Sequence, residues 1–273
     1  MICAWDHVLG VLPLWLRRQV EEVEAVQEIR LRLGKPTELI FSDRRQWLGQ
    51  AVSSQDLSFT VNAASRYSPW SAASAALGYV TAQGGHRIGI CGEAVLREGT
   101  VTGIREVSSL CIRVARDFPG IAEKAGELTG SILILGAPGW GKTTLLRDLI
   151  RQRSRFQTVG VVDARRELFP QDFDRGRQTD VLYGCPKAVG LGQLLRTMGP
   201  ETLAVDEITS QEDCTAILHA GNCGVSLLAT AHAGSLEDFK NRKLYESLWK
   251  SGLFQHYLVL HPDQSYDLEE IKQ

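Results

Sequence analysis

The sequence predicts an α/β protein in two parts: a small α+β domain over residues 1–116 and, after a linker at 117–130, a parallel sheet covered by helices over 131–273. Three observations support this. A chain of 273 residues is long enough for two domains with separate cores. The linker carries one proline and three glycines, and the composition changes after it. From residue 131 onward, apolar strand patterns alternate with helical patterns, which is typical of strands buried under helices on both faces.

The first part begins with an apolar stretch, residues 1–18, which charged residues and a proline interrupt. Since its basic residues follow the apolar run, we expect an amphipathic helix and not a signal peptide. Residues 26–41 alternate leucine and β-branched positions with charges around a Gly-Lys-Pro turn, which predicts a hairpin. The alanine-rich residues 65–80 predict a helix. Residues 84–116 predict several short strands separated by glycine-rich turns.

The second part has five short apolar runs, which we expect to be the strands of the parallel sheet. They are SILILG (131–136), TVGVVD (158–163), TLAVDE (202–207), VSLLATA (225–231) and YLVL (257–260). Helical patterns begin at Lys142, lie around Leu191–Met198, and end at Ala220. A longer helix is predicted over 235–252, where the apolar residues recur at helical spacing: Leu236, Phe239, Leu244, Leu248 and Trp249.

The composition is that of an ordinary globular protein, with 44% apolar and 23% charged residues. Thirty Lys and Arg against 32 Asp and Glu leave a formal charge of -2, so no overall charge attracts the chain to nucleic acid or anionic lipid. No segment offers the ~20 consecutive apolar residues of a membrane span. The six cysteines form no C-x-x-C pair, which disfavours a zinc or thiol redox site. We expect a soluble, cytoplasmic protein.

The most specific motif is GAPGWGKTT, residues 136–144, which follows the apolar run ILIL and opens a helical pattern. It fits G-x-x-x-x-G-K-[ST], the phosphate loop of P-loop NTPases, in the expected strand-to-helix context. Backbone N–H groups and the helix N-terminus would hold the phosphates of ATP. Lys142 would reach the terminal phosphates and the Thr143 hydroxyl would bind Mg²⁺. The predicted ATP-binding residues are Gly136, Ala137, Pro138, Gly139, Trp140, Gly141, Lys142, Thr143 and Thr144.

An acidic pair ends the apolar run TLAVDEI, residues 202–208. Asp206 would hold Mg²⁺ through water, and Glu207 would polarise the attacking water. Kinases of small molecules need no such glutamate, because the substrate hydroxyl is their nucleophile. The pair therefore favours ATP hydrolysis, with a solvated strand end as the alternative for Glu207.

A single histidine, His232, follows the next apolar strand in ATAHAGS, residues 229–235. A lone histidine is usually a structural residue. In P-loop ATPases with an extra strand between the phosphate loop and the Asp strand, however, the next strand ends close to the γ-phosphate. We therefore expect His232 to sense the γ-phosphate, and not to be a metal ligand or a general base.

With these motifs, the second part resembles the RecA-like ATPases of type II secretion and type IV pilus machines. Their phosphate loop, acidic box, Asp strand and T-x-H histidine box would be GAPGWGKTT, VVDARREL, LAVDEI and TAHAGS. A wider resemblance covers nearly the whole chain: EIRLRLGKPTEL, GGHRIGICGEAV, IREVSSLCIRVAR, TDVLYGCPKAVGLGQLLRTMGPETLAVDEI and GLFQHYLVL are similar to the stage III sporulation protein AA family.

This resemblance implies a cytoplasmic ATPase of the mother cell, a hexameric homo-oligomer held at the membrane by partner proteins of a secretion-like channel to the forespore. It also implies that Arg105 and Arg113, with Arg87 next, approach the phosphates and offset transition-state charge; exposure on a solvated strand is the alternative for each. The resemblance suggests no chemical role for Cys185, Pro186 and Lys187.

The chain departs from the family pattern in two places. The acidic box, residues 163–167, reads Asp-Ala-Arg-Arg-Glu where the family has D-E-R-S-E, so one carboxylate is missing and a role for Asp163 and Glu167 there is weakened. Ile-Thr-Ser also follows Glu207 where Ile-Gly is expected.

Two other functions stay open from the sequence. One is an ATP-binding scaffold with little turnover, which the missing carboxylate favours. The other is a nucleic-acid-stimulated P-loop ATPase, for which we find no basic aromatic surface or RNA-binding segment. The basic residues at 147–155 fit the C-terminal end of a helix, where its dipole favours cations, so we expect no nucleic-acid partner.

Overall fold

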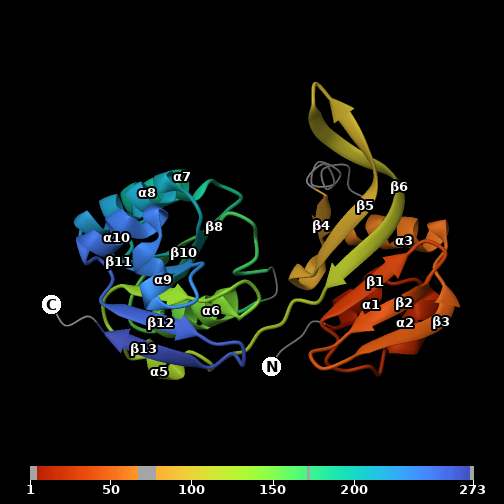
Figure 1. Cartoon of the computed structure of the whole chain (residues 1–273), viewed down its shortest axis with the longest axis horizontal. Coiled ribbons are helices and arrows are strands. Elements are labelled where there is room, and N and C mark those ends of the chain that lie inside the picture. The colour runs from red at the N-terminus through yellow and green to blue at the C-terminus, as the bar shows by residue number, and fades with distance from the viewer. Residues whose placement is uncertain (1–4, 67–77, 171–172, 271–273) are drawn as a thin grey trace. The chain divides into compact units, whose positions relative to one another are not determined.

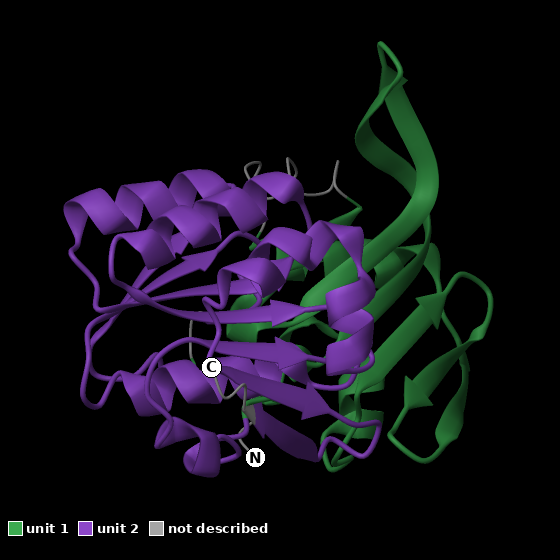
Figure 2. Cartoon of the chain, turned by 60° about the vertical axis from the view of Figure 1, so that its left-hand side comes forward, with its two compact units in different colours: residues 1–117, 170–173 green, residues 118–169, 174–273 purple. Residues whose placement is uncertain are grey.

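The computed structural model describes residues 5–66, 78–170 and 173–270, and its internal contacts divide the chain into two units (Figure 2). Unit 1 comprises residues 1–117 and 170–173, and unit 2 comprises residues 118–169 and 174–273. Each unit is built around its own sheet (Figure 1). In the part of the chain that the structure describes, no helix combines the length and apolar character needed to cross a membrane.

Unit 1 contains a six-stranded antiparallel sheet in the order β3-β2-β1-β6-β5-β4. Its strands are β1 (Glu28–Arg32), β2 (Pro36–Ile40), β3 (Arg45–Ala51), β4 (Tyr79–Thr81), β5 (Arg87–Arg97) and β6 (Thr100–Arg113). The predicted hairpin at 26–41 is confirmed as β1 and β2. Gly34 has a φ of 69° in the turn between them, a conformation that glycine adopts without steric cost.

Among the described residues of unit 1, three helices accompany this sheet: α1 (Trp5–Val11), α2 (Leu14–Val20) and α3 (Ser54–Ala64). The prediction of a single helix at 1–18 is wrong, because the helix is interrupted at Pro13. This residue has an extended backbone and is the N-cap of α2. Helix α3 begins with a capping box in which Ser53 and Asp56 bond each other's backbone N–H groups. Most of the helix predicted at 65–80 lies outside the described residues, and its last two residues belong to β4.

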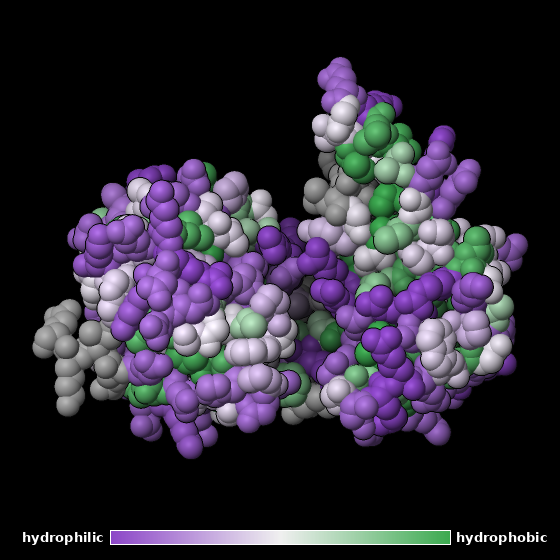
Figure 3. Space-filling view, viewed as in Figure 1, coloured by the Kyte–Doolittle hydropathy of each residue, from purple (hydrophilic) through white to green (hydrophobic). Residues whose placement is uncertain are grey.

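The several short strands predicted at 84–116 are instead one 3-10 turn, Gln83–Gly85, followed by the long hairpin of β5 and β6. Gly99 makes the turn of this hairpin: it and Glu98 both have positive φ, as a tight two-residue turn requires. Gly92 lies inside β5 at a register shift, where an added Cβ would be 2.7 Å from the Arg105 carbonyl oxygen. Beyond this bulge, Leu96 and Val101 are exposed. The space-filling view shows hydrophobic surface on the hairpin of β5 and β6 (Figure 3).

Unit 2 contains a seven-stranded sheet in the order β13-β12-β7-β11-β10-β8-β9. The strands are β7 (Ile132–Leu135), β8 (Val159–Asp163), β9 (Thr179–Tyr183), β10 (Thr202–Ile208), β11 (Ser226–Ala231), β12 (His256–Leu260) and β13 (Tyr266–Glu270). The five predicted strands are confirmed, and two edge strands, β9 and β13, are added. The sheet is not wholly parallel, because β13 follows β12 after a short loop and pairs antiparallel with it.

Helices cover both faces of this sheet (Figure 1). Alternate residues of β7 point to opposite faces, Leu133 and Leu135 into one apolar cluster and Ile132 and Ile134 into another. The first cluster packs under α7 (Lys187–Thr197), α8 (Gln211–Asn222), α9 (Leu236–Asn241), the 3-10 turn Lys243–Tyr245 and α10 (Glu246–Ser251). The second packs under α5 (Glu123–Gly126) and α6 (Lys142–Arg153). The long helix predicted at 235–252 is therefore three short pieces, because Arg242 is extended and ends α9.

Helix α6 is bonded to the segment before the sheet. The Asp148 carboxylate accepts the N–H groups of Gly120 and Ala122 at 3.0 and 2.8 Å. Arg153 donates to the carbonyl oxygens of Leu128 and Gly130 at 2.7 and 3.2 Å, and its side chain is buried. The arginines of this helix, Arg147, Arg151 and Arg153, are thus buried and donate hydrogen bonds to backbone carbonyl oxygens. The sequence indicated only a charged helix end.

Candidate functional site

The predicted phosphate loop connects the end of β7 to the start of α6 as the motif requires. Gly139 and Gly141 have φ values of 83° and 97°, in the left-handed region that favours glycine, and Gly141 is the N-cap of α6. Trp140 is partly buried against the apolar cluster beneath α6. The loop therefore presents a helix N-terminus, which attracts anions through its N–H groups and dipole.

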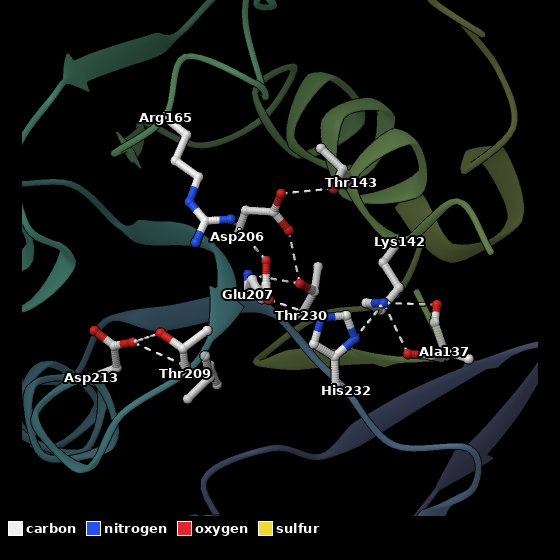
Figure 4. A network of polar contacts seen from close by, with 12 residues as sticks. Ala137, Lys142, Thr143, Arg165, Asp206, Glu207, Thr209, Asp213, Thr230 and His232 are labelled. Carbon is white, nitrogen blue, oxygen red and sulfur yellow. Dashed lines mark hydrogen bonds and ion pairs between the residues drawn. The ribbon is translucent and has the colours of Figure 1, made fainter. Parts of the chain in front are cut away.

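Lys142, the first residue of α6, lies across this loop (Figure 4). Its ammonium donates to the carbonyl oxygens of Gly136 and Ala137 at 2.9 and 3.0 Å, and its Nζ lies 3.0 Å from Nδ1 of His232. Burial lowers the pKa of Lys142, while the negative charges of Asp206 and Glu207 act in the opposite direction.

Asp206, near the end of β10, joins two hydroxyl groups (Figure 4). Its carboxylate accepts from Thr143 Oγ1 at 2.7 Å and from Thr230 Oγ1 at 2.8 Å. The two residues predicted as the metal site, Thr143 and Asp206, are thus in direct contact. The motifs predict no role for Thr230. It lies near the end of β11, the strand that leads to His232, and this position was the signal that could have found it.

His232 follows β11, which lies between the loop strand β7 and the Asp strand β10. Its Nε2 lies 2.8 Å from Oε1 of Glu207, and its Nδ1 faces the Lys142 ammonium. An ammonium only donates hydrogen bonds, so Nδ1 accepts and the ring proton is on Nε2, which donates to Glu207. His232 therefore connects Lys142 of the phosphate loop to Glu207 of β10, the strand beside β11.

Glu207 has a φ of 51°, which is unusual for a residue other than glycine. Strand β10 shifts register against β11 between Val205 and Ile208, so the chain bulges at this glutamate. Its N–H donates to Thr230 Oγ1 at 2.8 Å, and its carbonyl oxygen accepts from the ammonium of Lys187. Both backbone groups of Glu207 are thus bonded to side chains.

The altered acidic box divides into a buried and an exposed part. Asp163, at the end of β8, is buried and accepts the N–H groups of Glu167, Leu168 and Phe169 at 2.9 to 3.1 Å. Burial raises the pKa of the Asp163 carboxyl, and these three N–H groups lower it. Arg165 is exposed and its Nη1 lies 3.4 Å from Oε2 of Glu207. Asp163 therefore shapes the loop after β8, and Arg165 joins the site, which the sequence did not predict.

The predicted arginines lie on the sheet of unit 1 with acidic or aromatic neighbours. Arg105 pairs with Glu93 at 2.7 Å, and Arg113 lies 3.4 Å from Glu28. Both arginine side chains are 65% exposed. Arg87 lies over the ring of Tyr79, 4.0 Å from its centroid. Unit 2 thus brings together the loop, Asp206, Glu207 and His232, while Arg105 and Arg113 belong to the other unit.

Comparisons with known proteins agree with this fold. A family model described as "Sporulation stage III, protein AA" matches residues 7–269. The chain is 36% identical to "Stage III sporulation protein AA" of Bacillus subtilis (strain 168), over 93% of this chain and 90% of that protein. The structure resembles the Legionella pneumophila ATPase DotB, with a TM-score of 0.63 and 20% identity over 94% of this chain and 79% of that one. It also resembles the pilus retraction motor PilT, with a TM-score of 0.65 and 17% identity over 94% and 82% of the two chains. These likenesses confirm the predicted fold class.

Proposed function

The chain belongs to the sporulation stage III protein AA family, and we propose that it is a Mg²⁺-dependent ATP hydrolase that works in a secretion-like assembly during sporulation. The observation that carries this proposal is the line of contacts from Lys142 through His232 to Glu207. It joins a phosphate loop to an acidic residue suited to activating water. A kinase would need no such residue.

The loop and its surroundings fit ATP and Mg²⁺. Lys142 would bind the terminal phosphates, whose charge its ammonium offsets, and the N-terminus of α6 would favour the same anion. The Thr143 hydroxyl and the Asp206 carboxylate, 2.7 Å apart, are the hard oxygen donors that Mg²⁺ prefers. When bound, Mg²⁺ would neutralise charge on the phosphates as the γ-phosphoryl group leaves.

Glu207 would orient the attacking water and take up one of its protons. The water oxygen would bond to the γ-phosphorus while the bond to the bridging oxygen of ADP breaks, releasing ADP and inorganic phosphate. His232 holds one carboxylate oxygen of Glu207 and Arg165 lies beside the other. These contacts fix the direction in which the base points, which is the main contribution a protein makes to this reaction.

Replacement of Glu207 tests the hydrolase. Steady-state phosphate release is measured for the wild type and for Glu207→Gln under conditions that promote oligomers. Because the amide cannot accept the proton, we expect the variant to turn over about 10²–10⁴-fold more slowly. Binding of a fluorescent ATP analogue is the control and should be retained. Equal, negligible rates for both proteins would contradict the proposal.

By family membership we also propose that the chain forms a homo-oligomer, a hexameric ring, in the cytoplasm of the mother cell. It would be held at the membrane by membrane proteins of a channel to the forespore. In a closed ring, Arg105 and Arg113 of one subunit would face the ATP of the next subunit. There they would offset the charge of the transition state.

One observation favours the alternative of an ATP-binding scaffold with little turnover. The Asp163 carboxylate is buried and accepts three backbone N–H groups, so this residue of the acidic box shapes its own loop. The same phosphate-release assay separates the two functions. A scaffold would bind the ATP analogue tightly, and its slow phosphate release would be the same in the wild type and in Glu207→Gln.

A further inference from the structure

Lys187 is a partly buried cation at the start of a helix. It is the first residue of α7, after the N-cap Pro186, and its side chain is only 14% exposed. A positive charge is unfavourable at this end of a helix, because the helix dipole is positive there. Lys187 therefore opposes the local preference, and such departures are expected where tertiary contacts or function demand a residue.

The contacts of Lys187 explain its position. Its ammonium donates to the carbonyl oxygen of Glu207 and lies 3.3 Å from both Thr209 Oγ1 and Asp213 Oδ2. An ammonium has three N–H donors, and three acceptors surround it. Two of them belong to the short segment that runs from Glu207 to the start of α8.

Asp213 fixes the other side of the same segment. This residue lies in the first turn of α8, and its carboxylate accepts both the N–H and the hydroxyl of Thr209, at 3.0 and 3.1 Å. Asp213 is itself buried. Figure 4 shows the contact between Asp213 and Thr209. The first residue of α7 and the first turn of α8 thus both bond the turn after β10.

The segment needs such support because of its backbone. Glu207 has a φ of 51°, a conformation that costs free energy for a residue with a side chain. Rotation to an ordinary strand conformation would turn its carboxylate away from His232. Lys187 donates a hydrogen bond to the carbonyl oxygen of Glu207 itself.

From these contacts we propose that Lys187 is a positioning residue, which holds the main chain of Glu207 in the left-handed conformation that directs its carboxylate to His232. Lys187 touches Glu207 only through the backbone, so it sets the direction of the base and takes no part in proton transfer. The role in turnover rests on the proposed function, whereas the role in holding the backbone does not.

The first experiment measures turnover and nucleotide binding in the full chain. Lys187→Met keeps the length of the side chain but removes its donors, and we expect kcat to fall at least tenfold while the affinity for a fluorescent ATP analogue changes less than threefold. Lys187→Arg, which keeps donors, should recover part of the loss. Lys250→Met is the matched control, because Lys250 is exposed and pairs only with Glu246 among the contacts described. Loss of ATP affinity with unchanged kcat would overturn the proposal.

The second experiment needs no hydrolysis. Lys187→Met is combined with Glu207→Gly and with Glu207→Ala, and the melting temperature of each variant is measured with its own Glu207 background as reference. Both backgrounds lack the carboxylate, but only glycine adopts positive φ freely. We expect Lys187→Met to lower the melting temperature by several degrees more in the glycine background than in the alanine background, because the alanine backbone can relax out of the strained conformation and recover part of the loss. Equal losses would overturn the proposal whether or not the wild type hydrolyses ATP.

Discussion

His232 contacts a cation with one ring nitrogen and an anion with the other. Its Nδ1 accepts from Lys142 and its Nε2 donates to Glu207. A phosphate that draws Lys142 away would therefore leave Nδ1 without its donor, and the ring would register that change at Glu207. The sequence predicts a γ-phosphate sensor here, and the structure supplies a physical route by which such a sensor reaches the proposed base.

This route leads to a prediction for His232→Ala. We expect affinity for an ATP analogue to stay within about threefold of the wild type, because the loop keeps Lys142 and its N–H groups. Turnover should fall about 10²-fold, since Glu207 loses its fixed direction. Analogue fluorescence and phosphate release measure the two effects.

His261→Ala is the matched control for this substitution. It removes a histidine of the same unit that pairs with the exposed Asp267 and should change neither quantity. Weak binding with normal turnover of the bound fraction in His232→Ala would contradict the sensor role.

At the scale of the elements, helix α7 packs tightly against β8 at one glycine. An added Cβ at Gly190 would lie 2.7 Å from Cγ1 of Val162 on β8. Gly192, on the same helix, would meet only the end of the Arg196 side chain, at 3.3 Å. The first site has no room for a methyl group, while the second needs only a flexible side chain to move.

The two glycines form a matched pair of substitutions. We expect Gly190→Ala to lower the free energy of unfolding by about 1–3 kcal/mol, because it overpacks the contact between α7 and β8. Gly192→Ala should raise it by up to about 1 kcal/mol, the difference in helix propensity. Urea denaturation of both variants measures the effects. If both variants lose a similar free energy of unfolding, the close packing of α7 against β8 is not the cause of the loss.

In unit 2, the strands that the sequence predicted are those with continuous apolar runs. Strands such as Ile132–Leu135 and Thr202–Ile208 are buried in the centre of the sheet, so their patterns are clear. Strands β9 and β13 were missed because, at the edges, TDVLY and YDLEE carry charges like those of loops. The break at Arg242 also has no proline or glycine to mark it.

The site shows the same division. Motifs with fixed spacing located Lys142, Thr143, Asp206, Glu207 and His232, which meet in unit 2. Arg165 and Lys187 lie 42 and 20 residues before Glu207, and their contacts depend on the bulge at that residue. Spacing along the chain carries no signal for contacts that a loop creates.

At the scale of the whole molecule, the oligomer remains a prediction. Mass photometry with and without a non-hydrolysable ATP analogue checks whether the chain forms a ring and whether nucleotide promotes it. We expect a hexamer whose population rises with the analogue, because a site completed by a second subunit binds nucleotide and partner together. A monomer under both conditions would contradict this prediction.

Arg105 and Arg113 allow a test of sites shared between subunits. Either arginine changed to alanine, and Glu207→Gln, should each be nearly inactive alone. After subunit exchange at equal amounts, randomly mixed rings should recover about a quarter of wild-type phosphate release, since that share of interfaces has both intact partners. Activity no higher than the sum of the two variants would show that the arginines do not act across subunits.

Helix α6 gives the site a mechanical connection. It starts at Lys142 in the phosphate loop, is about 18 Å long, and is tied through Asp148 and Arg153 to residues 120–130, near the start of unit 2. Because a hydrogen-bonded helix hardly changes length, the phosphate loop and residues 120–130 are held at a fixed separation by α6. A change of position at Lys142 would therefore be accompanied by one in the segment that Asp148 and Arg153 bond.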